Sequence, residues 1–106
     1  MTFSNDRELI RKIENTFDGY ELREIRVLIN ANLSDIKTKV YVQTHGLRFL
    51  DAIVKDSCDV LTSYLNGKVR VGDSRKYVEF FQNRVDVAEE LKELLLKRTS
   101  SHGAKF

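Results

Sequence analysis

The chain has 106 residues, of which 42% are hydrophobic and 32% are charged. This composition excludes a disordered chain, and the length suits one globular domain, which we assign to residues 1–98. The net charge of +2, from 18 basic and 16 acidic residues, is too small to indicate a dedicated nucleic-acid-binding protein by itself.

The first predicted helix covers residues 6–17. Asn5 and Glu8 fit a helix-start pattern, in which a capping side chain is followed three residues later by a carboxylate. Gly19 suits the left-handed conformation that often ends a helix. The apolar residues at helical spacing are Leu9, Ile10, Ile13 and Phe17.

Residues 21–43 are open to two interpretations. As a β-hairpin, the inward positions of the first strand are Ile25, Val27 and Ile29, and those of the second are Ile36, Thr38, Val40 and Val42. The segment 31–34 between them resembles a turn. One face of this hairpin is apolar throughout, as a half-buried sheet requires.

The same residues also fit a helix. Apolar side chains then recur at steps of three and four, at Leu22, Ile25, Ile29, Leu33, Ile36 and Val40. This helix would place Val27 and Val42 on the wet face, and Asn30, Asn32 and Ser34 in its interior, where they are mediocre helix formers. The many β-branched residues favour the hairpin.

A turn is predicted at 44–46 and a helix at 47–66, which Asn66 and Gly67 would end. The inward stripe of this helix is expected to hold Leu47, Leu50, Val54, Cys58, Leu61 and Leu65. Residues 68–71 suit a short third strand or an extended linker.

The last predicted helix covers residues 73–98, and a flexible tail is expected over 99–106. Its apolar face is unusually wide, because two adjoining stripes run along it. A chain of this size has a modest core, so the wider face suggests association with another protein or with a second copy. The expected interface residues are Tyr77, Phe80, Val87, Leu91 and Leu94.

A basic segment precedes and begins this helix. Residues 37–76 hold 8 basic and 4 acidic side chains, a net charge of +4. Cations are disfavoured in the first turn of a helix unless an anion binds there, which suggests a phosphate or nucleic-acid site. The candidate residues are Lys68, Arg70, Ser74, Arg75 and Lys76, with Lys37 and Lys39 added if the hairpin lies alongside.

The sequence contains no pattern of catalytic or metal-ligating residues. His45 is expected to be a structural turn residue, and Cys58 a buried, inert thiol on the apolar stripe of its helix. A single cysteine excludes an internal disulfide, and with no apolar run long enough for a signal or a membrane span we expect a cytoplasmic protein. We expect no cofactor.

Taken together, these patterns predict an α+β domain in the order helix, hairpin, helix, short strand, long helix, with an all-α bundle as the alternative. The predicted function is a small non-enzymatic interaction module, acting as a homodimer, adaptor or inhibitor through its last helix. The alternative is a nucleic-acid-binding regulatory protein that uses residues 68–76.

Overall fold

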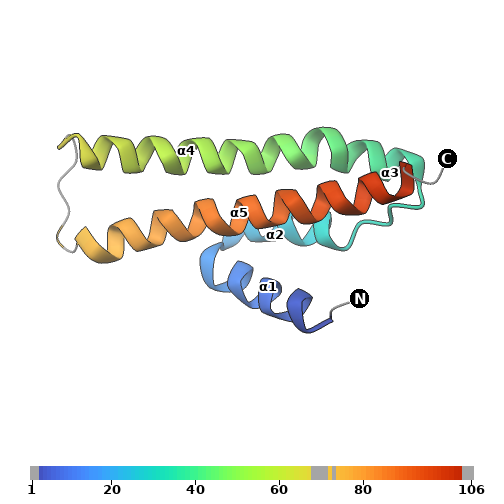
Figure 1. Ribbon diagram of the computed structural model, residues 1–106, viewed down its shortest axis with the longest axis horizontal. Helices are drawn as coiled ribbons and strands as arrows, with labels where there is room; N and C mark the ends of the chain where they lie inside the picture. Colours follow the sequence, from blue (N-terminus) through green and yellow to red (C-terminus); the bar gives the residue numbers. More distant parts are fainter. Residues whose placement is uncertain (1–2, 68–71, 73, 104–106) are drawn as a thin grey trace.

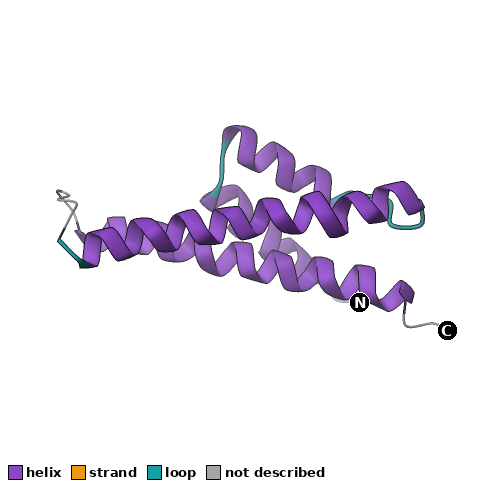
Figure 2. Ribbon diagram, turned by 90° about the horizontal axis from the view of Figure 1, so that it is seen from above, coloured by secondary structure: helices purple, strands orange, loops and turns teal. Residues whose placement is uncertain are grey.

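The computed structural model describes residues 3–67, 72 and 74–103, and every regular element in this part of the chain is helical. The α-helices are α1 (Phe3–Thr16), α2 (Gly19–Ile29), α3 (Ile36–Tyr41), α4 (Leu47–Leu65) and α5 (Ser74–Gly103), and a π-helical segment, η1 (Val42–Gly46), joins α3 to α4. Helices α4 and α5 form a long antiparallel hairpin, and α1 and α2 pack near its middle (Figures 1 and 2).

The hydrophobic core lies where α1 and α2 meet the α4–α5 hairpin. Helix α5 contributes four residues to it, and α2, η1 and α4 supply most of the rest. The buried cluster consists of Leu9, Ile13, Phe17, Ile25, Leu28, Val42, Leu50, Ile53, Val87, Ala88, Leu91 and Leu95. Burying these side chains is the main favourable contribution to folding.

The α+β prediction is wrong, because the residues expected to form a hairpin are helical. Ile25 and Leu28, one helical turn apart in α2, are both buried, whereas Val27 is 52% exposed. A two-stranded hairpin is only marginally stable without further strands, and β-propensity yields readily to tertiary packing. Packing of α2, as a helix, against the α4–α5 pair therefore prevails over strand formation. The predicted third strand, 68–71, lies outside the described residues.

The single-helix alternative for 21–43 is also only partly right. The chain leaves helix after Ile29, and Asp35 caps a separate helix, α3. Ile36 and Val40 of the expected stripe are exposed, whereas Val42 is fully buried. The helix breaks where Asn and Ser side chains compete with the helical backbone for hydrogen bonds.

The predicted turn at 44–46 is instead part of η1. This π-helical segment buries both Val42 and Gly46. A Cβ added at Gly46 would lie 2.7 Å from Cδ2 of Leu28, so the glycine allows α2 to pack close against the backbone of η1. Gly67 has positive φ and follows the end of α4 at Leu65, as predicted. Gly19 also has positive φ, but it is the first residue of α2, and α1 already ends at Thr16.

Helix α4 is rotated slightly from the predicted orientation. Its buried residues are Leu50, Ile53 and Ser57, whereas Cys58 is exposed. The prediction of a buried thiol is therefore wrong, because Ser57 takes the inward position and accepts a hydrogen bond there. Helix α5 runs to Gly103, beyond the predicted end at residue 98, and Thr99 is buried. Residues 104–106 of the expected tail lie outside the described residues.

The molecule is elongated. Its principal extents are 51 × 26 × 24 Å and its radius of gyration is 15.6 Å, compared with about 13 Å for a compact chain of this length. Helix α5 has 30 residues and α4 has 19, but α1 and α2 have only 14 and 11. The hairpin therefore extends beyond the helices that pack on it (Figure 1).

The cap of α3 provides a test of the fold. Oδ2 of Asp35 accepts hydrogen bonds from the backbone N–H and the hydroxyl of Thr38, at 2.9 and 2.8 Å. The side-chain hydrogen bond from Thr38, followed by the backbone one, lowers the pKa of Asp35 below its usual 3.8. Because the pKa is lower in the folded state, the carboxylate stabilises the fold above pH 3.8, and this contribution is lost as the pH falls through the folded pKa.

We therefore expect Asp35→Ala to lower the melting temperature at pH 7, and we expect its difference from the wild type to shrink as the pH is lowered below 3.8. Asp35→Asn keeps an acceptor without a titrating group and is the matched control. Thermal unfolding followed by circular dichroism would measure all three proteins. A wild-type advantage over Asp35→Ala that does not shrink as the pH is lowered below 3.8 would contradict the role of this carboxylate.

Candidate protein-interaction surface

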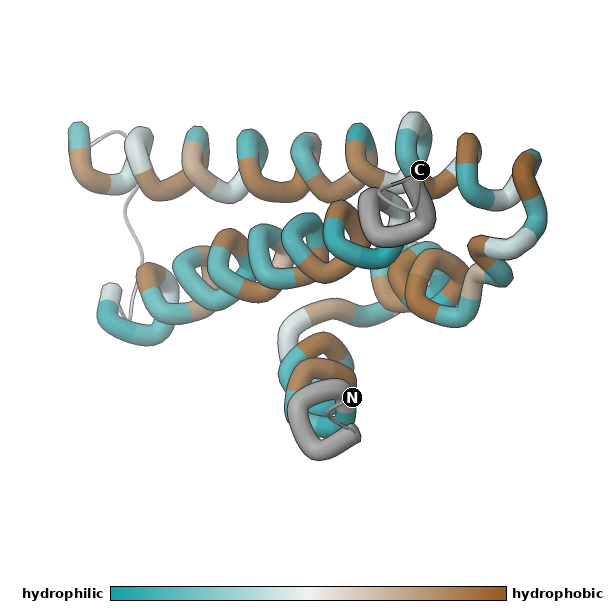
Figure 3. Tube along the Cα trace, turned by 45° about the vertical axis from the view of Figure 1, so that its right-hand side comes forward, coloured by the Kyte–Doolittle hydropathy of each residue, from teal (hydrophilic) through white to brown (hydrophobic). Residues whose placement is uncertain are grey.

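The free end of the hairpin carries a cluster of apolar side chains that do not belong to the core. We call residues 58–67 of α4 and its cap, with 74–83 of α5, the arm. None of its large apolar side chains is buried, and none joins the core cluster. These side chains are Val60, Leu61, Tyr64, Leu65, Tyr77, Val78, Phe80 and Phe81. Hydrophobic positions continue along both helices to this end (Figure 3).

Four aromatic rings of the arm contact one another in sequence. The centroids of Tyr64 and Tyr77 are 5.5 Å apart, those of Tyr77 and Phe81 are 5.1 Å apart, and those of Phe80 and Phe81 are 5.0 Å apart. Such spacings are typical of favourable ring pairs. Despite these contacts Phe80 remains 48% exposed, and Leu65 beside the cluster is 77% exposed. Among the described residues, no other element covers the arm, so it presents an apolar surface held together by ring contacts.

Arg84 marks the boundary between the arm and the core. Its guanidinium donates two hydrogen bonds to the carboxylate of Glu21, at 2.9 and 2.7 Å, and one to Oγ of Ser57, at 3.2 Å. The same group lies 5.3 Å from the ring centroid of Phe17 and 5.8 Å from that of Phe80. Arg84 thus connects α5 to α2, to α4 and to Phe17, which directly follows α1.

The structure divides the predicted interface residues into two groups. Tyr77 and Phe80 lie in the arm and are at least partly exposed. Val87 and Leu91 are buried in the core of the single chain, and Leu94 packs against that core. The outer part of the wide apolar face is therefore available to a partner, whereas its inner part already contacts α1 and the rest of the bundle.

The predicted basic site is not assembled as one patch. Ser74, Arg75 and Lys76 begin α5 and are exposed at the tip of the arm. Lys37 and Lys39 lie on α3, at the other end of the long axis (Figure 1). Lys68 and Arg70 lie outside the described residues. The predicted β-hairpin over residues 21–43, which would have brought Lys37 and Lys39 beside the start of α5, does not form.

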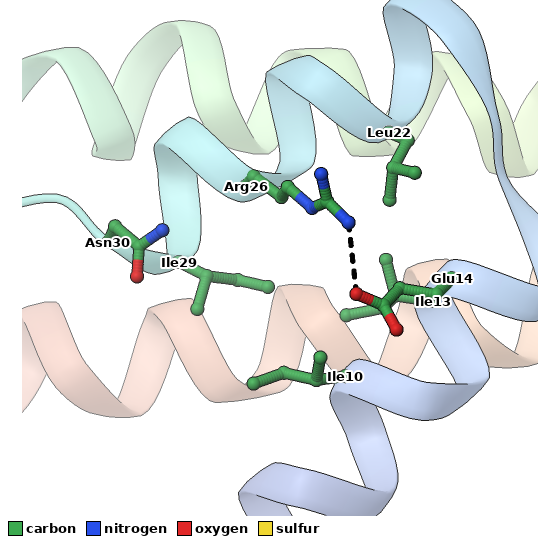
Figure 4. A pocket seen from close by; sticks show the side chains of 7 residues that line it. All are labelled: Ile10, Ile13, Glu14, Leu22, Arg26, Ile29 and Asn30. Carbon is green, nitrogen blue, oxygen red and sulfur yellow. Dashed lines mark hydrogen bonds and ion pairs between the residues drawn. The ribbon is translucent and has the colours of Figure 1, made fainter.

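Two small cavities lie between α1 and α2, and the second also reaches α5. The first has a volume of about 120 Å³, and Arg26 and Glu14 form an ion pair of 2.9 Å at its edge (Figure 4). The second, of about 160 Å³, shares Ile10, Ile29 and Asn30 with it. Ligand pockets usually measure about 300–1,000 Å³, so neither cavity indicates a small-molecule site.

A wider recess of about 300 Å³ lies between α2, η1 and α4. The ring centroids of Tyr41 and His45 are 5.3 Å apart, with the ring planes tilted by 32°, and the Tyr41 hydroxyl donates a hydrogen bond of 2.8 Å to Glu24. This bond, which favours the neutral phenol, is the main reason that the pKa of Tyr41 is raised above 10.0. His45, predicted as a turn residue, thus lies in a helical segment with an aromatic neighbour.

Sequence reasoning missed Arg84 and Glu21, and it assigned Leu61 and Leu65 to an inward stripe. Helix lengths could have indicated the arm, because a helix rises only about 1.5 Å per residue and the short first helix cannot cover the last one. Nothing in the sequence marked Arg84 among the other charged residues of α5, since its partners come from distant segments.

Within the described residues, no group of histidine, cysteine or acidic side chains could hold a metal ion. No helix of this part of the chain combines the length and the apolar character that a bilayer span requires. Comparisons with protein-family models, with curated proteins and with solved structures found no match. The geometry of the chain is therefore the basis for the function proposed below.

Arg84 itself is open to a direct test. Arg84→Met removes the cation but leaves the carboxylate of Glu21 partly buried, and we expect a loss of about 2–4 kcal/mol in the free energy of unfolding. Arg26→Met is the control, because its ion pair with Glu14 is exposed and should contribute less than about 1 kcal/mol. Urea denaturation would measure both losses. Equal losses in the two variants would show that Arg84 has no special structural role.

Proposed function

We propose that this chain is a small protein-interaction module without enzymatic activity, and that the arm is its contact surface. The observation that carries the proposal is that the eight large apolar side chains of the arm all lie outside the core. Contiguous exposed apolar surface on a folded protein commonly marks an interaction site. The arm holds two tyrosines, a residue type enriched among the side chains that dominate binding energy.

The form of the arm supports a helix-on-helix contact. Two antiparallel helices leave a groove between them, into which side chains of one or two further helices can pack. The ring contacts within the arm keep its shape before a partner arrives, which reduces the ordering cost of binding. The proposal includes a cytoplasmic location, because an exposed cysteine without a disulfide partner suits a reducing compartment.

Photocrosslinking from the arm would test this function. A photoreactive phenylalanine analogue placed at Leu65 should form adducts with protein partners in cells that produce the chain naturally. The same analogue at Ile36 is a matched control, since both positions are apolar, 77% exposed and at opposite ends of the molecule. Discrete adducts from position 65 alone support the arm as the contact surface.

The complementary substitution is Leu65→Asp. For this test the photoreactive group is placed at Phe80, and Leu65→Asp should abolish the adducts formed from that position. The substitution should change the free energy of unfolding by less than about 0.5 kcal/mol, because Leu65 is exposed. Ile36→Asp should leave the adducts unchanged. Equal crosslinking from positions 65 and 36, or adducts that survive Leu65→Asp, would overturn the assignment of the arm.

A further inference from the structure

We propose that the recess between α2, η1 and α4 binds a small zwitterion in which a quaternary ammonium group lies close to an anionic group, as in phosphocholine. This inference goes beyond the function proposed above and uses no residue of the arm. It follows from the aromatic side chains that line the recess and from two opposite charges in it that form no ion pair within the described chain.

The recess has the volume of a small-ligand site. Its volume of about 300 Å³ reaches the range of ligand pockets, whereas the two cavities beside α1 measure about 120 and 160 Å³. One of its walls is η1, and π-helical segments are rare and frequently lie at functional sites. The recess therefore differs from the other cavities both in volume and in the element that lines it.

Four aromatic side chains line the recess. Tyr20 of α2 and Phe49 of α4 meet edge to face, with ring centroids 6.1 Å apart. Tyr41 and His45, from the end of α3 and from η1, form the second ring pair. The ring of Tyr20 is 66% exposed, so it is accessible to a ligand. Aromatic faces attract cations, and cages of aromatic rings are typical binding sites for quaternary ammonium groups.

A carboxylate lies beside these rings. Glu24 of α2 is half-buried, and its Oε2 accepts the hydrogen bond from the Tyr41 hydroxyl. In the described part of the chain, no cation forms an ion pair with this carboxylate. A partly desolvated negative charge is more stable next to a positive one. A quaternary ammonium group supplies that charge without N–H groups, so it needs no further hydrogen-bond acceptor from the recess.

The second charge of the recess is the guanidinium of Arg48, on α4. It is exposed, and among the described residues it forms no ion pair, neither with Glu24 nor with any other carboxylate. A simple cation bound beside Glu24 would be repelled by Arg48. An anionic group attached to the same ligand would instead accept hydrogen bonds from the guanidinium, whose N–H groups suit phosphate oxygens. The two charges together therefore favour a zwitterion over a simple cation.

Titration of the full chain with phosphocholine, followed by amide NMR, would test the site. We expect saturable shifts of the backbone amides of Tyr41, His45 and Ala52, with a dissociation constant of about millimolar order, because the ligand is small. Choline should bind at least about fivefold more weakly, since it leaves Arg48 without an anion. The neutral choline analogue 3,3-dimethylbutanol, which has a similar shape without the charge, should produce no saturable shifts.

Three variants separate the two charges. Glu24→Gln keeps an acceptor for the Tyr41 hydroxyl but removes the charge, and it should weaken the binding of both choline and phosphocholine at least about tenfold. Arg48→Gln should reduce the affinity for phosphocholine to about that for choline, without weakening the binding of choline. Glu79→Gln is the matched control, because it removes an exposed carboxylate of the arm and should change neither affinity.

Several results would overturn the proposal. Phosphocholine that produces no saturable shifts at about 20 mM, well above the expected dissociation constant, would exclude the site. Inorganic phosphate or 3,3-dimethylbutanol that binds as tightly as phosphocholine would exclude recognition of a zwitterion. Equal affinities of the wild type and Glu24→Gln would contradict the role of the carboxylate.

Cosedimentation with phosphatidylcholine vesicles would distinguish two sources of the ligand. Binding of both phosphocholine and the vesicles would identify a lipid headgroup, and binding of phosphocholine alone would identify a soluble compound; either result supports the recess as the site. Crosslinking from Leu65 reports on the arm and not on the recess, so each proposal can fail without the other.

Discussion

The contact that most determines the shape of this protein is the one made by Arg84. A guanidinium that is largely removed from water needs its charge paired and its N–H groups satisfied, and here one carboxylate and one hydroxyl meet that need. Glu21 belongs to α2 and Ser57 to α4, and Phe17, whose ring the guanidinium also contacts, directly follows α1. A side chain in the middle of α5 therefore sets where the two short helices sit on the long hairpin.

The rest of the architecture follows from that position. On the carboxyl-terminal side of Arg84, α5 packs against α1 and is hydrogen-bonded to α2, and Val87, Ala88, Leu91 and Leu95 are buried in a continuous core. On the amino-terminal side no further helix of the described chain covers the hairpin, and the aromatic side chains there remain partly exposed. Phe80 contacts the same guanidinium as Phe17, so the uncovered cluster is physically continuous with the core.

This continuity has a consequence for how the arm would work. A surface that is packed against a rigid core through Arg84, and held together by its own ring contacts, keeps its form without a partner. A rigid helical pair loses little conformational entropy on association, so a small contact area can still produce useful binding.

The sequence by itself determined the local features, because they depend on neighbouring residues alone. The repeat of apolar residues from Leu47 specified α4, Gly67 marked its end, and the repeat from residue 77 specified α5. Only the tertiary structure decided whether residues 21–43 would form strands or helices, because their apolar residues fit both the strand repeat and the helix repeat. Packing of α2 against the α4–α5 pair selects the helix. It also decided that Ser57 rather than Cys58 points inward, and that Val87 is buried while Phe80 is exposed, because those outcomes depend on contacts between segments far apart in the chain.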